Sequence, residues 1–230
     1  MHEGYPPHAE EDEAEEARPL GEGGVERTRR STGWGELDAL LGRPEAPGVV
    51  DGFVYYIIGP PGAGKTTLAL KILESSPETP LCLSAEQPES EVAARARELA
   101  ITREILFAGV TEMGAIERLC HKHRPRDVVI DSIGCVYDAR SGRPPGSNAA
   151  VEHAMLRIYE LAHSLRITAW VLGHVNAKGR ARGTVTTIHW CDCLLAVRGQ
   201  GAEPRELYFP RPLKNRGGQT GGALALGNWP

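Results

Sequence analysis

The sequence lacks any apolar run that approaches the roughly 20 residues needed to cross a bilayer, although 41% of its 230 residues are hydrophobic. It also lacks a secretory signal, because the N-terminus opens with Met-His-Glu-Gly-Tyr-Pro-Pro and turns acidic, where a signal would be basic and then apolar. These absences exclude membrane insertion, and we expect the protein to stay in the cytoplasm.

Cysteine pairs of the CxxC type are absent as well. The five cysteines are an odd number, and most of them lie in apolar runs typical of core strands or helices. Cys191 and Cys193 are the only close pair. Residues two apart on a strand point to the same face, but the further soft ligands that a zinc site needs are missing nearby. We therefore expect reduced thiols and no structural zinc.

Basic residues are missing from residues 1–16, which hold seven of the acidic residues. The formal net charge of the chain is −4, so that the remaining residues carry +3. A mildly basic body tolerates a polyanionic partner without requiring one. We interpret residues 1–25 as an acidic arm, either a solvated disordered tail or a segment that competes with nucleic acid for the basic surface.

The length suits one α/β domain, predicted here over residues 26–230, in addition to the arm. A short amphipathic helix carrying Leu37, Leu40 and Leu41 ends at Gly42. Strands and helices then alternate, which predicts a mostly parallel central sheet flanked by helices. The predicted strands are 53–58, 81–85, 104–108, 128–131 and 167–173, and the predicted helices are 65–75, 89–99, 113–121 and 148–166. Late strands at 193–197 and 207–210 predict an antiparallel edge.

The strongest motif fits GxxxxGK[ST] and lies between an apolar strand and a helical pattern. Its glycines let successive backbone N–H groups and a helix N-terminus face the β- and γ-phosphates of a nucleotide. Lys65 would neutralise the transferred charge, and the Thr66 hydroxyl would bind Mg²⁺. The predicted nucleotide-binding residues are Gly59, Pro60, Pro61, Gly62, Ala63, Gly64, Lys65, Thr66 and Thr67.

Three more residues follow apolar strands and are expected near this loop. Asp131 ends a strand about 65 residues later, which is typical of a Walker B carboxylate that holds the metal; otherwise it is a helix cap. Glu86 follows the second strand and is the candidate general base for water, unless it is an exposed acid. His174 would sense the γ-phosphate or polarise that water, or else caps its strand.

Together these stretches resemble the RecA-type ATPase core, and most closely the bacterial RadA/Sms DNA-repair family. The resemblance covers about residues 31–218 and rests on the phosphate loop and on further short motifs. These are Ser31-Thr32-Gly33 with Glu36-Leu37-Asp38, Ser84-Ala85-Glu86, Asp131-Ser132-Ile133, Pro145-Gly146-Ser147, Gly173-His174-Val175, His189 with Asp192, and Lys214-Asn215-Arg216. It implies an RecA-like P-loop fold and a ring-forming, DNA-stimulated ATPase that uses ATP and Mg²⁺ and helps branch migration in recombination.

Two departures from the family pattern limit the helicase or translocase part of this expectation. The family usually has a four-cysteine zinc module before the core and a Lon-protease-like domain after it, and neither pattern occurs in these 230 residues. The family's Lys-Asn-Arg-Phe-Gly is here Lys214-Asn215-Arg216-Gly217-Gly218, without the aromatic residue.

Two basic segments, the second of them glycine-rich, are candidates for contacts with single-stranded or branched DNA. One carries Arg140 and Arg143, and the other carries Lys178, Arg180 and Arg182 after His174, where a ring ATPase of this type points loops at its channel. Neither segment has an aromatic residue for base stacking, so phosphate contacts without sequence preference are expected. A solvated basic loop is the alternative.

Ring ATPases place the γ-phosphate at a subunit boundary, where a cation from the neighbour stabilises developing charge. Lys214 and Arg216 are predicted to act in this way, which implies a homo-oligomer, a hexameric ring by the resemblance. The other function classes are a KaiC-like regulatory ATPase that binds protein and a non-hydrolysing, nucleotide-gated module. Glu86 argues against the latter.

Overall fold

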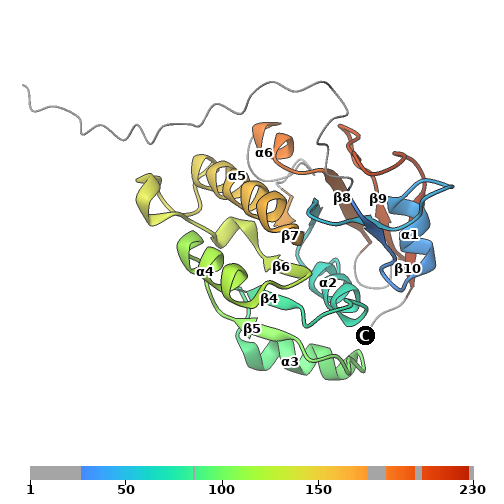
Figure 1. The fold of residues 1–230 in the computed structure, drawn as a ribbon, viewed down its shortest axis with the longest axis horizontal. Helices are drawn as coiled ribbons and strands as arrows, with labels where there is room; N and C mark the ends of the chain where they lie inside the picture. The colour runs from blue at the N-terminus through green and yellow to red at the C-terminus, as the bar shows by residue number, and fades with distance from the viewer. Residues whose placement is uncertain (1–26, 85, 176–184, 200–203, 228–230) are drawn as a thin grey trace, which may run out of the picture.

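The computed structural model of the chain describes residues 27–84, 86–175, 185–199 and 204–227. Within these residues, eight strands form one sheet in the order β10-β9-β8-β3-β7-β6-β4-β5 (Figure 1). The strands are β3 (Val54–Gly59), β4 (Leu81–Ser84), β5 (Leu106–Ala108), β6 (Asp127–Asp131), β7 (Thr168–His174), β8 (Cys193–Arg198), β9 (Arg205–Tyr208) and β10 (Ala223–Gly227). Strands β3 to β8 are parallel, whereas β9 and β10 are antiparallel.

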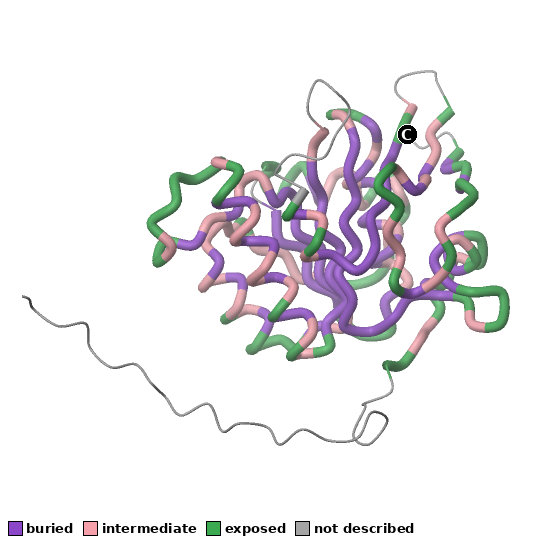
Figure 2. The backbone as a smooth tube through the Cα atoms, turned by 90° about the horizontal axis from the view of Figure 1, so that it is seen from above, coloured by how far each residue is buried: buried purple, intermediate pink, exposed green. Residues whose placement is uncertain are grey.

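The helices form a layer on each face of the sheet. They are α1 (Gly35–Leu41), α2 (Lys65–Glu74), α3 (Glu89–Glu98), α4 (Met113–His123), α5 (Asn148–Leu165) and α6 (Val185–His189), with single 3₁₀ turns η1 (Ile133–Cys135) and η2 (Ala139–Ser141). Side chains of β3 alternate between the layers: Tyr55 and Ile57 pack with α1 and α2, whereas Tyr56 and Ile58 pack with α4 and α5. The sheet is therefore buried on both faces, as Figure 2 shows.

Local sequence explains where the longer elements begin. Helix α5 starts after Ser147, whose hydroxyl accepts a hydrogen bond from the Ala150 N–H at 3.2 Å. Its buried stripe, which includes Val151, Met155 and Ile158, faces the sheet. Among the described residues, no helix is both long and apolar enough to cross a membrane.

The segment before α1 binds to the amino ends of the central strands through pairing and ionic contacts. Strand β1 (Arg29–Arg30) pairs with β2 (Val49–Val50). The Arg30 guanidinium donates to the buried carboxylates of Asp51 and Asp127. Asp127 also accepts from the Trp170 indole at 2.9 Å, so that this ionic cluster joins three distant parts of the chain.

The predicted α/β fold with a parallel sheet and an antiparallel late edge is confirmed. The predicted order of strands and helices is found, with ends that differ by up to two residues. Strand β5 begins at Leu106 and not at Glu104. Strand β10 was not predicted, because only Leu224 and Leu226 are buried in it and glycines precede it. The arrangement is that of a RecA-like P-loop core.

Candidate nucleotide-binding site

The phosphate loop joins β3 to α2 and depends on glycine at defined positions. Gly62 and Gly64 have positive φ angles of 76° and 91°, which favour glycine. A Cβ atom on Gly59 would lie 2.9 Å from the carbonyl oxygen of Val197 on β8, so that a side chain there would push the strands apart. Ala63 is buried and anchors the loop in the core.

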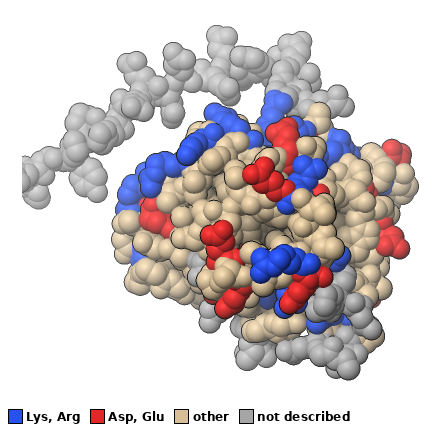
Figure 3. Space-filling view, turned by 90° about the horizontal axis from the view of Figure 1, so that it is seen from below, with Lys and Arg blue, Asp and Glu red and all other residues tan. Residues whose placement is uncertain are grey.

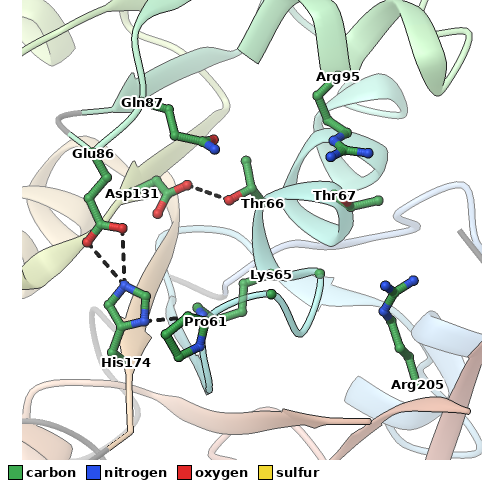
Figure 4. Close-up of a pocket in the computed structure, with 12 residues that line it drawn as sticks. Pro61, Lys65, Thr66, Thr67, Glu86, Gln87, Arg95, Asp131, His174 and Arg205 are labelled. Atoms are coloured by element: carbon green, nitrogen blue, oxygen red, sulfur yellow. Dashed lines mark hydrogen bonds and ion pairs between the residues drawn. The ribbon is translucent and has the colours of Figure 1, made fainter. Parts of the chain in front are cut away.

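A cavity of about 310 Å³ lies beside this loop at the carboxyl ends of the parallel strands (Figure 4). It is lined by Pro61, Gly62, Gly64, Lys65, Thr66, Thr67, Glu86, Gln87, Arg95, Asp131, His174 and Arg205. The structure thus brings together the phosphate loop and the three residues that were expected near it. Gly59, Pro60 and Ala63 shape the loop and are not among the lining residues.

Thr66 and Asp131 offer oxygen atoms at one side of the cavity. The Thr66 hydroxyl donates to Asp131 Oδ2 at 2.7 Å, which joins the first turn of α2 to the end of β6. Burial raises the pKa of Asp131 above its ordinary value, although the Thr66 hydrogen bond acts in the opposite direction. A hydroxyl and a carboxylate are hard donors that fit Mg²⁺.

The Lys65 ammonium is held by the loop itself. Its Nζ atom donates to the carbonyl oxygens of Gly59 and Pro60 at 3.0 and 2.9 Å and lies 3.5 Å from His174 Nδ1. Burial lowers the pKa of Lys65, whereas the carboxylates of Asp131 and Glu86 act to raise it. A partly desolvated ammonium at this position can transfer its hydrogen bonds to phosphate oxygens.

Glu86 and His174 face each other on one side of the cavity, and His174 lies between Glu86 and the Lys65 ammonium (Figure 4). The two Glu86 carboxylate oxygens lie 3.2 and 3.1 Å from His174 Nε2, and one of them accepts a hydrogen bond from the Ser132 hydroxyl. Burial acts to raise the pKa of Glu86, but the hydrogen bonds from Ser132 and His174 outweigh it and keep this pKa below its ordinary value. An ionised carboxylate can accept a proton from water.

The position of His174 depends on the preceding glycine. A Cβ atom on Gly173 would lie 2.5 Å from the Tyr56 hydroxyl oxygen and 2.6 Å from the ring. Tyr56 is fully buried in β3, so the ring has no room to move aside. In the parallel register, Gly59 is the partner of His174, which places the start of the phosphate loop next to it.

Sequence reasoning missed Gln87, Arg95 and Arg205, which also line the cavity. Figure 4 shows the two arginines on the side away from Glu86 and His174. Arg95 lies on α3, nine residues after Glu86. The helix predicted directly after Glu86 was the sequence signal that could have placed Arg95 near the cavity. Arg205 lies on β9 and reaches the cavity because β9 pairs antiparallel with β8. No sequence motif predicts this pairing.

Lys214 and Arg216 do not line this chain's own cavity. The Lys214 ammonium donates to the carbonyl oxygens of Ile188 and His189 at 2.7 and 2.9 Å. The Arg216 guanidinium donates to Asp192 Oδ1 at 3.0 Å and to the Tyr159 hydroxyl at 3.1 Å. Both side chains are thus anchored within the chain, and about half of the Arg216 side chain, 48%, stays exposed.

The proposed DNA contacts lie partly outside the described residues. Lys178, Arg180 and Arg182 belong to the part of the chain that the structure does not describe. Arg140 and Arg143 lie before α5, away from the cavity lining. Arg140 pairs with Asp138 at 3.3 Å and with Glu117 at 3.8 Å, so its charge is partly balanced, whereas Arg143 is exposed.

Comparison with known proteins finds relatives that are DNA repair proteins. DNA repair protein RadA of Aquifex aeolicus is 30% identical over 199 residues, 85% of this chain and 44% of the relative. The RadA proteins of Pseudomonas aeruginosa and Bacillus subtilis are 32% and 31% identical over 84% and 85% of this chain, and 42% of each is covered. No protein-family model matches the chain. The chain spans less than half the length of these relatives, and over that span it is similar to RadA proteins and has the α/β arrangement of a RecA-like core.

Proposed function

We propose that this chain hydrolyses ATP to ADP and phosphate and is stimulated by DNA in DNA repair or recombination. The observation that carries the proposal is the convergence of Lys65, Thr66, Asp131, Glu86 and His174 on one cavity, although they come from four strand ends. The names of the relatives, all described as DNA repair proteins, support the cellular role.

In the proposed reaction, the loop N–H groups and Lys65 bind the β- and γ-phosphates of ATP. A water oxygen attacks the γ-phosphorus atom as the bond to the β–γ bridging oxygen breaks, and ADP leaves. Glu86 accepts the proton of that water, and His174 holds the Glu86 carboxylate in place. Thr66 and Asp131 would hold Mg²⁺, which neutralises phosphate charge when it is bound.

We place the DNA contacts on the basic segments around Arg140 and Arg143 and around Lys178, Arg180 and Arg182. The second segment follows directly after His174 along the chain. A change at the γ-phosphate would therefore reach this segment through β7. Contacts to phosphates without base stacking fit a protein that acts on single-stranded or branched DNA of any sequence.

Assembly into a homo-oligomeric ring is part of the same proposal. Arg216 is anchored by Asp192 and Tyr159 yet half exposed, which suits a guanidinium presented to a neighbouring subunit's ATP. Lys214 would act beside it. The relatives favour this interpretation over a KaiC-like regulatory ATPase, since each is a RadA protein.

The test is ATP turnover by the purified chain with and without single-stranded DNA. We expect DNA to raise turnover, and replacement of Lys178, Arg180 and Arg182 by Ala to remove the stimulation while DNA-free turnover is kept. Each lost phosphate contact should reduce the slope of the logarithm of DNA affinity against the logarithm of salt concentration by roughly 0.7. Turnover that DNA does not change would contradict the DNA-dependent part, and no turnover would contradict the ATPase.

A further inference from the structure

A row of basic side chains lies at the edge of the molecule opposite the nucleotide cavity. Arg126 precedes β6 and Arg166 precedes β7, so both lie at the amino ends of these strands, and the Thr168 N–H donates to the Arg126 carbonyl oxygen at 2.9 Å. We call the following residues the basic edge: Arg27, Lys122, Arg124, Arg126 and Arg166. Figure 3 shows basic side chains in a row along the upper left of the face seen from below.

Two helix ends are brought together at this edge. Cys120 of α4 shares a small apolar cavity with Leu161 and Ala162 of α5, so the C-termini of the two helices are neighbours. Each helix ends in an arginine with a positive φ angle, Arg124 at 45° and Arg166 at 56°. Their charges balance the partial negative charge of two helix ends and leave an excess.

Acidic residues within the described chain balance only part of the basic edge. Asp51 pairs with Arg126 and with the more buried Arg30, which also pairs with Asp127. Arg27, Lys122, Arg124 and Arg166 form no ion pair with an acidic residue in the part of the chain that the structure describes. All four are exposed, so the basic edge presents an uncompensated positive surface.

The acidic arm of the same chain lies close in sequence to the basic edge. Arg27, which is part of the edge, is the first described residue and closely follows the arm. The Arg27 guanidinium lies 2.7 Å from His163 Nδ1, and Arg27 lines a cavity together with Arg166. Glu16 precedes Arg27 by eleven residues. At no more than about 3.5 Å per residue, this length spans at most roughly 40 Å, enough to return across the basic edge.

We propose that the acidic segment 10–16 of this chain docks on its own basic edge. The segment has six carboxylates, namely Glu10, Glu11, Asp12, Glu13, Glu15 and Glu16, and no basic residue. The tether raises the effective concentration of the segment near the edge, where several weak charge contacts then add up. Docking of this kind would prevent other polyanions from binding to the basic edge until salt or a stronger competitor displaces the segment.

Zero-length carbodiimide cross-linking tests the docking without ATP or DNA, and so independently of the proposed function. It joins carboxylates to amines, and Lys122 is the only lysine of the basic edge. We expect the tryptic peptide of residues 1–27, since the Arg18–Pro19 bond resists trypsin, to be joined through a carboxylate of residues 10–16 to the peptide that contains Lys122 at ~50 mM salt, and the product to disappear at ~0.5 M. Fragmentation of the joined peptides locates the carboxylate. An equal mixture of light and isotopically heavy chains should give no mixed product.

A matched pair of variants separates docking from general charge attraction. Arg124→Gln with Arg166→Gln, which keeps Lys122, should lower the yield of the product severalfold, whereas Arg43→Gln with Arg97→Gln should leave it unchanged. Both control arginines are exposed, and they lie on other elements, Arg43 after α1 and Arg97 on α3. Thermal unfolding checks that each variant folds.

Four outcomes would overturn the proposal. They are the absence of the product, equal yields on Lys71 and Lys122, mixed light and heavy products, and insensitivity to the Arg124 and Arg166 changes. A variant pair that loses affinity for an oligonucleotide, while the parent chain shows no cross-link, would instead make the basic edge a nucleic-acid surface.

Discussion

His174 Nε2 lies 3.2 and 3.1 Å from the two carboxylate oxygens of Glu86, so that the ends of β7 and β4 meet although 88 residues separate them. On its other side, His174 Nδ1 lies 3.5 Å from the Lys65 ammonium. The histidine therefore links the residue proposed to accept a proton with the residue proposed to bind phosphate. Replacement of each partner should give a different kinetic result.

Glu86→Gln should retain ATP binding and lower turnover by about 100-fold or more, because the amide cannot accept the proton of the attacking water. Lys65→Ala should both abolish turnover and weaken nucleotide binding. Fluorescent-nucleotide titration and phosphate release measure the two effects separately. Turnover by Lys65→Ala at the parent rate would refute the assignment of the site.

Arg95 and Arg205 line the cavity on the side away from the proposed reacting atoms, so they should contribute to nucleotide affinity more than to chemistry. We expect Arg95→Gln and Arg205→Gln each to weaken ADP binding by about tenfold, with a smaller effect on turnover at saturating ATP. Isothermal titration measures the affinity. Arg97→Gln on the same helix and Arg211→Gln serve as controls, since neither residue lines the cavity, and equal effects in the controls would disprove the assignment.

Arg216→Ala should remove turnover if the guanidinium acts on the neighbouring subunit's ATP. Mixing Arg216→Ala chains with Lys65→Ala chains should restore part of the activity, because only mixed assemblies contain an interface with both groups intact. Phosphate release at several mixing ratios measures the recovery. Turnover per chain that does not depend on protein concentration, measured on a monomer, would contradict action between subunits.

Asp192 is expected to stabilise the fold in a pH-dependent manner. Burial acts to raise its pKa, but hydrogen bonds from His163, the Val54 N–H and Arg216 hold the pKa below its ordinary value. The stabilisation is therefore present above the pKa of the unfolded state, about 4, and is lost as the pH falls through the lower folded-state pKa.

Asp192→Asn should lower the free energy of unfolding by about 2 kcal/mol at pH 7, because Arg216 and His163 lose a charged acceptor. The difference between the parent and the variant should shrink as the pH falls below about 4. Urea unfolding at both pH values measures it, with the exposed Glu45→Gln as the control. A difference that grows on acidification would contradict the assigned sign.

The alternation of apolar runs and helical patterns was enough to predict the order of elements, because each buried strand is a short apolar run bounded by polar residues. Glu86, Asp131 and His174 could be placed near the phosphate loop, since parallel strands end at one edge. The sequence carries no sign that β3 lies between β7 and β8. For the same reason Arg205 was missed, because its place depends on the pairing of distant strands.

The pairing of Gly59 with His174 at the centre of the sheet has a consequence for how the site fails on heating. Gly59, where the phosphate loop begins, and His174 are adjacent residues of hydrogen-bonded strands, and the buried Tyr56 ring fills the space beside Gly173. The spacing between them cannot loosen unless the most buried part of the chain opens. We therefore expect ligand binding and the folded state to be lost at one temperature, without local unfolding of the site at a lower temperature.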